Sequence, residues 1–130
     1  MALRATPTQA DVLQTLKQHA KPLSAYQLQE KLKPLHPKIT VPTVYRALKF
    51  LVGQGAVHRV ESVNAYIACQ HSHHTSDAVL AICDDCGSVA ETVAPDLSRS
   101  LTGLANAAGF ALDHKVVELH GHCSDCRGQK

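Results

Sequence analysis

The stretch VPTVYRALKFLVGQGAVHRVE, residues 41–61, predicts a helix followed closely by a β-strand. Thr40 supplies a capping hydroxyl in front of it, and apolar residues then recur at helical spacing. A glycine, Gly53 or Gly55, ends the helix, and residues 57–61 alternate in the manner of a strand.

The polar side of this predicted helix fits contact with DNA. It carries one threonine, one tyrosine and two cations, namely Thr43, Tyr45, Arg46 and Lys49. Arg46 could bind a guanine edge in the major groove through two hydrogen bonds, and Lys49 suits a phosphate. An ordinary solvated helix face is the alternative interpretation.

The residues on either side of that helix favour the DNA-binding interpretation. Capping boxes that begin at Thr6 and Ser24 predict two helices upstream, the second with Leu28, Leu32 and Leu35 on its apolar face. Downstream, residues 57–61 and 65–68 alternate around a turn. Three helices and a two-stranded wing form a winged helix-turn-helix domain, which we place at residues 1–67.

The charge distribution separates the two halves of the chain. Residues 1–62 hold nine Lys/Arg and three Asp/Glu, a net +6, whereas residues 63–130 hold four and eight, a net −4. The basic half therefore favours a nucleic-acid partner. The 130 residues are 45% hydrophobic, enough for a core. They contain no membrane-length apolar run and no signal peptide, so we expect a cytoplasmic protein with no membrane partner.

The second half predicts a small α/β unit at residues 78–130, so the expected fold class is α+β. Residues 78–82, 88–93 and 115–120 are β-prone, and residues 96–109 form a helix. The apolar side of that helix consists of Leu97, Leu101, Leu104, Ala105 and Ala108. An exposed edge of the predicted sheet could pair with a second copy of the chain, which makes this a dimerisation domain.

Four of the five cysteines form two C-x-x-C pairs, Cys83 with Cys86 and Cys123 with Cys126. Paired knuckles supply the four ligands of a closed tetrahedral zinc site. A pair of redox motifs is the rival interpretation. Asp84, Asp85 and Asp125 lie beside these cysteines, and we expect their carboxylates to raise the pKa of the thiols, which disfavours redox chemistry.

The segment CQHSHHTS, residues 69–76, concentrates further metal ligands. Cys69, two imidazoles and the carboxylate of Glu91 could form a second tetrahedral zinc site, with His58 of the wing as one imidazole. Candidates for the other are His71, His73 and His74. Such a site would make residues 68–77 a hinge that carries metal ligands. In the alternative interpretation, the histidine cluster is a solvated loop.

Enzymatic function is not expected. A zinc deaminase needs His-x-Glu ahead of Pro-Cys-x-x-Cys, and the sequence contains neither element. Both predicted zinc sites are filled by protein ligands, which leaves no open position for a hydrolase and no site for a small organic substrate. A zinc buffer or redox sensor without DNA is disfavoured by the basic first half.

Four motifs resemble the ferric uptake regulator family, most of all its zinc-sensing branch, the zinc uptake regulators. They are TVYRAL (43–48), GAVHRVES (55–62), ICDDCG (82–87) and HGHC (120–123). The resemblance covers nearly the whole chain in order. It implies a homodimeric repressor that, when loaded with zinc, binds an A/T-rich inverted repeat in double-stranded DNA upstream of zinc-acquisition genes.

The resemblance also implies two zinc ions per chain, one structural and one regulatory. The structural ligands are Cys83, Cys86, Cys123 and Cys126, and the sensing ligands are His58, Cys69, His74 and Glu91. His74 is favoured by the His-Thr-Ser match, with His71 and His73 as alternatives. The sulfur of Cys69 favours zinc over iron or manganese, the metals sensed in the alternative assignment. Tyr26 joins Tyr45 and Arg46 as a DNA contact.

The sequence departs from the family pattern at two places. Members usually have a further helix before the segment that begins at Thr6. A third metal site in some members uses an acidic residue where Ser98 stands here, so we expect no third site, although His114 is present.

Overall fold

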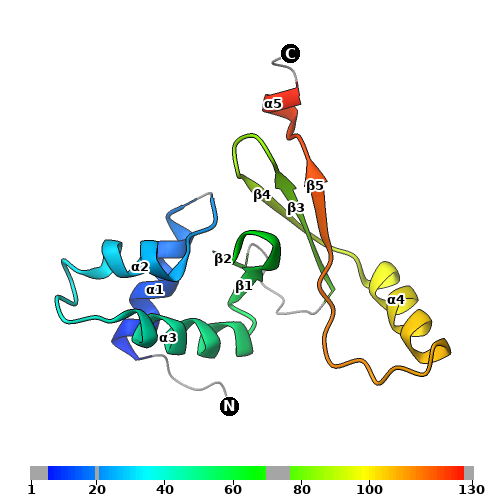
Figure 1. The fold of residues 1–130 in the computed structure, drawn as a ribbon, viewed down its shortest axis with the longest axis horizontal. Coiled ribbons are helices and arrows are strands. Elements are labelled where there is room, and N and C mark those ends of the chain that lie inside the picture. Colours follow the sequence, from blue (N-terminus) through cyan, green and yellow to red (C-terminus); the bar gives the residue numbers. More distant parts are fainter. Residues whose placement is uncertain (1–5, 20, 70–76, 128–130) are drawn as a thin grey trace. The chain divides into compact units, whose positions relative to one another are not determined.

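The computed structural model describes residues 6–19, 21–69 and 77–127, and the chain divides into two compact units, residues 1–74 and 75–130 (Figure 1). Three helices and a two-stranded hairpin make up the first unit. Its elements are α1 (Pro7–Lys17), α2 (Ala25–Leu32), α3 (Val41–Gly53), β1 (Val57–Val60), the 3-10 turn η1 (Glu61–Val63) and β2 (Ala65–Ala68). The predicted winged helix-turn-helix is therefore confirmed as a fold.

Side-chain caps begin all three helices of the first unit. The Thr6 hydroxyl accepts from the backbone N–H of Gln9 at 3.2 Å, and the Gln9 side chain accepts from the Thr6 N–H at 2.8 Å. Ser24 and Gln27 form the same reciprocal box ahead of α2. These bonds satisfy N–H groups that a helix start leaves without partners.

The core of the first unit lies where the three helices and the hairpin meet. Its fully buried side chains come from every helix and from β1, namely Val12, Leu16, Leu28, Leu32, Val44, Leu48 and Val57. The prediction for Leu35 was wrong, since this side chain is 67% exposed. The helix α2 ends at Leu32, because Pro34 has no N–H with which to continue the helical ladder.

The hairpin is antiparallel and pairs Val57 with Ala68 and Val60 with Ala65. Asn64 adopts φ 49° at its tip, a left-handed conformation that asparagine tolerates better than most residues. Leu23 and Tyr66 exchange two backbone hydrogen bonds, which anchor the hairpin to the segment before α2. The strand β2 of the wing is thus hydrogen-bonded to the segment that leads into α2.

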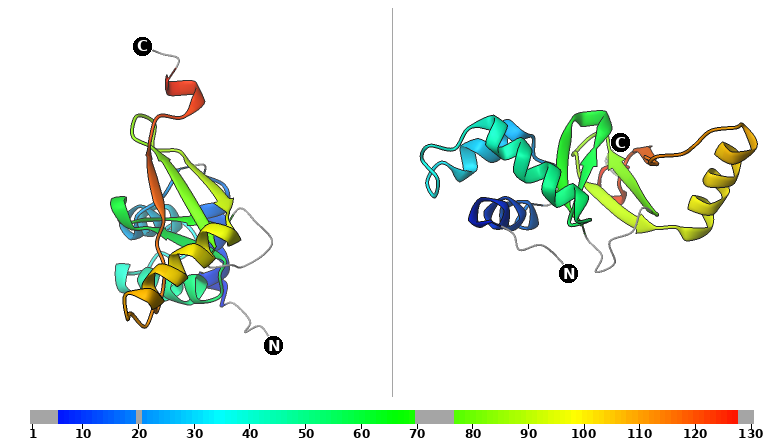
Figure 2. Two further views of the ribbon diagram at one scale, coloured as in Figure 1. Left: turned by 90° about the vertical axis from the view of Figure 1, so that its right-hand side faces the viewer. Right: turned by 90° about the horizontal axis from the view of Figure 1, so that it is seen from below.

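The second unit is a three-stranded mixed sheet with two helices, seen from further sides in Figure 2. Its elements are β3 (Ala78–Cys83), β4 (Val89–Val93), α4 (Pro95–Ala107), β5 (Glu118–Gly121) and α5 (Ser124–Arg127). The order is β4-β3-β5, with β3 antiparallel to β4 and parallel to β5. The strand β4 returns the chain to the end of the sheet where β3 begins, and α4 with residues 108–117 then leads past β3 to the start of β5.

The burial of α4 differs from the sequence prediction. Its apolar stripe is present, but Leu97 is 42% and Leu104 is 66% exposed, and Ser98 is the one buried residue of the helix. The last strand begins at Glu118, three residues later than predicted, and the single turn α5 was not predicted. Among the described residues, no helix is both long enough and apolar enough to cross a lipid bilayer.

Candidate metal centre and DNA-binding face

The second unit brings the sulfur atoms of four cysteines together, with every pair of them within 4.8 Å. Cys83 ends β3, Cys86 lies in the turn after it, Cys123 follows β5 and Cys126 lies in α5. The register of β5 against β3 sets Gly121 opposite Cys83, so the second cysteine pair begins beside the first.

The spacing of the sulfurs fits a tetrahedral zinc ion. With zinc–sulfur bonds of about 2.3 Å, tetrahedral geometry separates neighbouring sulfurs by about 3.8 Å. The Sγ atoms of Cys86 and Cys123 lie 3.8 Å apart. All four cysteines are free thiols, so the cluster is a set of four ligands and not two disulfides. Donor set and spacing together make it a candidate structural zinc site.

Hydrogen bonds to sulfur lower the pKa of two of these thiols. The backbone N–H groups of Cys86 and Cys123 each lie 3.4 Å from the Sγ of Cys83, and they lower its pKa from 9.0 to about 6. The Ser88 hydroxyl, 3.1 Å from the Sγ of Cys86, lowers the pKa of that thiol. Thiolate is the form that binds zinc, so the lowered pKa values of Cys83 and Cys86 favour metal binding.

The fourth thiol behaves differently. Hydrogen bonds from Cys126 to the sulfurs of Cys123 and Cys83 hold its proton and raise its pKa. Zinc coordination must therefore displace the proton of Cys126, and binding weakens as the pH falls.

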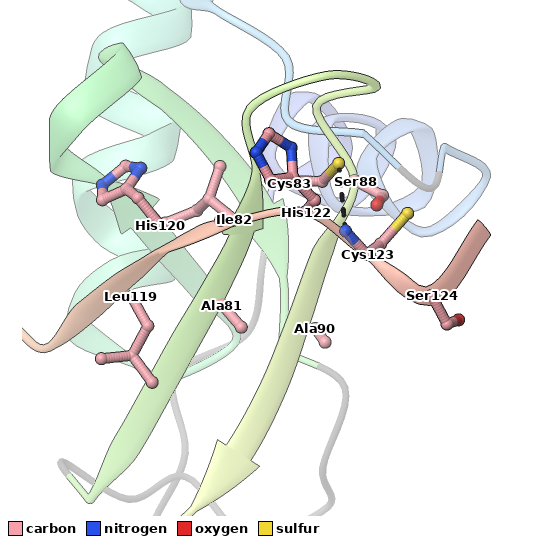
Figure 3. Close-up of a pocket in the computed structure, with 11 residues that line it drawn as sticks. Ala81, Ile82, Cys83, Ser88, Ala90, Leu119, His120, His122, Cys123 and Ser124 are labelled. Atoms are coloured by element: carbon pink, nitrogen blue, oxygen red, sulfur yellow. Dashed lines mark hydrogen bonds between the residues drawn. The ribbon is translucent and has the colours of Figure 1, made fainter. Parts of the chain in front are cut away.

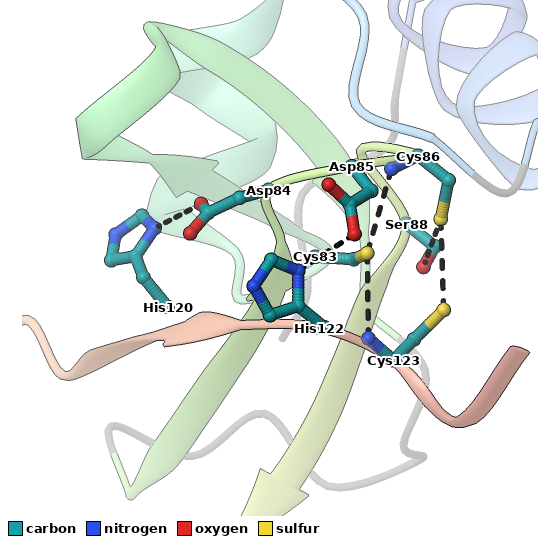
Figure 4. A network of polar contacts seen from close by, with 8 residues as sticks. All are labelled: Cys83, Asp84, Asp85, Cys86, Ser88, His120, His122 and Cys123. Carbon is teal, nitrogen blue, oxygen red and sulfur yellow. Dashed lines mark hydrogen bonds and ion pairs between the residues drawn. The ribbon is translucent and has the colours of Figure 1, made fainter. Parts of the chain in front are cut away.

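The expectation that nearby carboxylates raise the thiol pKa values was wrong for Cys83 and Cys86. Figure 4 shows that Asp84 and Asp85 face histidines of the strand segment opposite. Asp85 Oδ2 lies 2.7 Å from Nδ1 of His122, and Asp84 Oδ1 lies 3.3 Å from Nδ1 of His120. The backbone N–H of Asp85 also lowers the pKa of Cys83.

The two aspartate–histidine pairs link one cysteine knuckle to the strand that leads into the other. A backbone bond of 2.8 Å from the Asp84 N–H to the Gly121 carbonyl reinforces the link. Reasoning from the sequence missed this role. One signal was available in the sequence. The first knuckle contains two adjacent aspartates, and two histidines, His120 and His122, stand at alternate positions just before the second knuckle, where both can face the aspartates.

A hollow of about 400 Å³ lies beside the cluster, and residues of all three strands of the second unit line it (Figure 3). Cys83 and Cys123 contribute to its wall together with His120 and His122. The hollow gives an approach from solvent to two of the four ligands.

In the first unit, the structure places the predicted DNA-contacting side chains on the surface. Tyr45, Arg46 and Lys49 are exposed on α3, and Thr43 is half-buried on its first turn. Tyr26, 66% exposed, lies at the start of α2. A helix that presents cations and tyrosine hydroxyls suits phosphates and base edges in a DNA groove.

The predicted second metal site is described only in part. His58 lies on β1 and Cys69 follows β2, where its N–H donates to the Ala56 carbonyl at 2.8 Å. A ring nitrogen of His58 and the Sγ of Cys69 lie within 4.8 Å of each other. In the second unit, Glu91 is buried on β4 opposite Leu80. The candidate ligands His71, His73 and His74 lie outside the described residues.

Comparison with known proteins places the fold and these motifs in one family. The chain is 42% identical over 125 residues to the zinc uptake regulation protein of Escherichia coli strain K12, and the match covers 95% of this chain and 73% of that protein. A solved zinc uptake regulator complexed with zinc and DNA superposes with a TM-score of 0.92 at 41% identity, covering 98% and 85% of the two chains. The holo XcZur crystal structure superposes at 0.88 with 39% identity, covering 98% and 89%. The family model described as the ferric uptake regulator family matches residues 1–120, and the chain belongs to that family.

Proposed function

We propose that this protein is a zinc-responsive transcriptional repressor that binds DNA as a homodimer. The observation that carries the proposal is its close match, over nearly its whole length, to a zinc uptake regulator solved with both zinc and DNA. The targets we propose are A/T-rich inverted repeats upstream of zinc-uptake genes. A repressor acts where the DNA is, so the proposal places the protein in the cytoplasm.

The four cysteines would hold a structural zinc ion. Support comes from the sulfur separation of 3.8 Å and from the N–H donors that favour the thiolate of Cys83. When bound, zinc would cross-link four positions of this small unit and so stabilise its folded state. It would join the end of β3 to the segment after β5, the two ends of the sheet's parallel pair.

A second, regulatory zinc ion would bind His58, Cys69, Glu91 and His74, with His71 and His73 as alternatives for the last. This assignment makes two zinc ions per chain. It rests on the sequence, together with the proximity of His58 and Cys69 in the first unit. The thiolate of Cys69 favours zinc over iron or manganese, so a member that senses one of those metals is the second candidate.

The proposed regulatory ligands come from three segments, namely the DNA-binding domain at residues 1–67, the hinge at 68–77 and the dimerisation domain at 78–130. A ligand that favours one arrangement of two domains shifts the population toward it, in proportion to its differential affinity. Ligands drawn from both domains give zinc that differential affinity, and this is how zinc would control binding to the operator.

The homodimer is supported by the apolar surface of the second unit. Large apolar side chains are exposed on and after α4, namely Leu97, Leu104, Phe110, Leu112, Val116 and Leu119. The strand β5 also lies at the edge of its sheet. A second copy of the chain would cover this surface and pair with the edge, because the same patch is self-complementary under two-fold symmetry.

Catalysis is not part of the proposal. The four cysteine sulfurs would complete the coordination shell of a zinc ion and leave no open position for a substrate, and the chain belongs to a family of regulators. A DNA-binding function also accounts for the net +6 charge of residues 1–62, which a zinc hydrolase or a zinc buffer would not need.

The first prediction concerns the structural zinc. Cys83→Ser or Cys126→Ser should unfold the second unit, because structural zinc contributes on the order of 10 kcal/mol to the folding of small metal domains. Metal analysis should show one zinc fewer per chain, and circular dichroism should show lost structure. A folded, dimeric Cys83→Ser protein with undiminished zinc would refute the four-cysteine assignment.

The second prediction concerns the regulatory zinc. Cys69→Ser and His58→Ala should leave the dimer and the four-cysteine zinc intact but remove the zinc dependence of operator binding. Zinc per chain, dimer mass and operator affinity are measured on the same samples, with His19→Ala as the control histidine variant. Tight binding by both mutants that still required added zinc would exclude His58 and Cys69 as sensing ligands.

The third prediction separates recognition of bases from binding to the backbone. Arg46→Ala should cost roughly 1–3 kcal/mol of discrimination between operator and altered sequences, through loss of a bidentate guanine contact. Lys49→Ala should weaken binding to all sequences alike and reduce the slope of log K against log salt. Equal loss of specific and nonspecific affinity in Arg46→Ala would show that another face reads the bases.

The fourth prediction tests the dimer surface. Leu104→Asp places a charge in the apolar surface of α4 and should raise the dimer dissociation constant at least about tenfold, since burying an unpaired charge is costly. Sedimentation velocity measures the mass. Val63→Asp changes a similarly exposed apolar residue on the wing and should leave the dimer unaffected. Unchanged dimerisation in Leu104→Asp would place the interface elsewhere.

A further inference from the structure

A short chain of hydrogen bonds runs along the exposed side of the first turns of α3. The Nη2 atom of Arg46 donates to the Oγ1 of Thr43 at 3.2 Å. The Oγ1 atoms of Thr43 and Thr40 lie 3.0 Å apart, and the backbone N–H of Thr43 donates to the Thr40 hydroxyl at 3.4 Å. This series of hydrogen bonds therefore connects the guanidinium of Arg46 to Thr40, the residue that caps the helix.

The chemistry of the groups fixes the direction of the bond between Arg46 and Thr43. A guanidinium can only donate, so the Thr43 oxygen is the acceptor from Arg46. The hydroxyls of Thr43 and Thr40 share a hydrogen bond in which either oxygen can be the donor, because each hydroxyl has one proton and two acceptor lone pairs. The Thr43 hydroxyl is thus bonded both to the guanidinium and to the residue that caps the helix.

We propose that Thr43 is a positioning residue that fixes the guanidinium of Arg46 for reading a guanine, and that it does not itself read the DNA. This inference rests on the proposed DNA-binding function. Two observations carry it, namely the 3.2 Å bond to Arg46 and the half-buried position of Thr43 beside the exposed arginine.

The physical gain is preorganisation. A free arginine side chain has many rotamers, and ordering it on binding costs affinity for the correct base. The Thr43 hydroxyl is itself hydrogen-bonded to the Thr40 hydroxyl at 3.0 Å, so it offers a fixed point three residues before Arg46. Arg46 has five N–H donors, and one bond to Thr43 leaves enough for a bidentate contact with guanine.

A double-mutant cycle tests the proposal. The variants are Thr43→Val, Thr43→Ser, Arg46→Ala and Thr43→Val with Arg46→Ala. The probe is a duplex selected from a random pool by the wild-type, zinc-loaded dimer, beside the same duplex with each G·C pair in turn changed to A·T. Dissociation constants come from fluorescence anisotropy at one fixed salt concentration, and melting curves check the fold.

Thr43→Val should lower the discrimination at one G·C pair about 2- to 10-fold, the range expected for ordering one long side chain. Thr43→Ser, which keeps the hydroxyl, should stay within about twofold of the wild type. In the Arg46→Ala background, Thr43→Val should change nothing, because the group that Thr43 positions is gone. The slope against salt should be the same for Thr43→Val and the wild type, since no phosphate contact is lost.

Two results would overturn the proposal. An equal loss from Thr43→Val with and without Arg46 would mean that Thr43 contacts the DNA itself, and no loss from Thr43→Val would mean that Arg46 needs no support. If Arg46→Ala left discrimination intact, the recognition face in the proposed function would also be wrong. Melting curves show whether a loss of discrimination comes from a damaged fold. Thr43→Val should melt like the wild type, because the backbone N–H of residue 43 still donates to the Thr40 hydroxyl.

Discussion

The parallel pairing of β5 with β3 is the constraint on which the rest of the second unit depends. It sets Gly121 opposite Cys83, so the cysteines that follow β5 reach those that end β3. Between the two knuckles the chain runs back along β4, passes through α4 and residues 108–117, and returns along β5. These elements account for the 36 residues that separate Cys86 from Cys123. The same pairing aligns the aspartates of the first knuckle with the histidines before the second.

The thiol chemistry shows which local effect dominates at these cysteines. Formal charge alone predicted raised pKa values, since three aspartates lie beside the sulfurs in the sequence. The structure turns two of their carboxylates toward His120 and His122 and directs backbone N–H groups at the Cys83 sulfur. The N–H donors lie 3.4 Å from the Cys83 sulfur and stabilise its thiolate directly. The carboxylates of Asp84 and Asp85 are bonded to histidines and screened by water, so they affect the thiol less. With the pKa of Cys83 near 6, the case against redox chemistry rests on geometry, because the four sulfurs form one ligand set.

Local sequence signals predicted the first unit well. Capping boxes at Thr6 and Ser24, helical spacing in residues 41–53 and alternation in the hairpin each depend on neighbours within a few residues, and the structure has these elements where the sequence placed them. Leu35 has the spacing of a buried helical residue, but α2 ends at Leu32, so Leu35 does not lie on the helix and its side chain is exposed. The cysteine cluster was predicted from the two C-x-x-C pairs. The aspartate–histidine pairs were missed, because they depend on the register of β5 against β3, and only the pattern of adjacent aspartates and alternate histidines pointed to them. The bond from Arg46 to Thr43 lies at helical spacing, yet the sequence alone does not select that rotamer.

The exposed leucines of α4 mark a different limit of sequence reasoning. The period of the apolar residues correctly predicted an amphipathic helix, because period is a property of the chain alone. Burial is a property of the assembly, and in a single chain the stripe remains open while Ser98 faces inward. An apolar face of this kind is stable in water only at a cost that grows with its area, about 25 cal/mol per Å² left uncovered. A helix that retains such a face on a small unit is therefore best explained by a surface outside the chain that covers it. A second copy of the chain meets this requirement, because it is always present at the same concentration and has the same apolar face and the same exposed sheet edge.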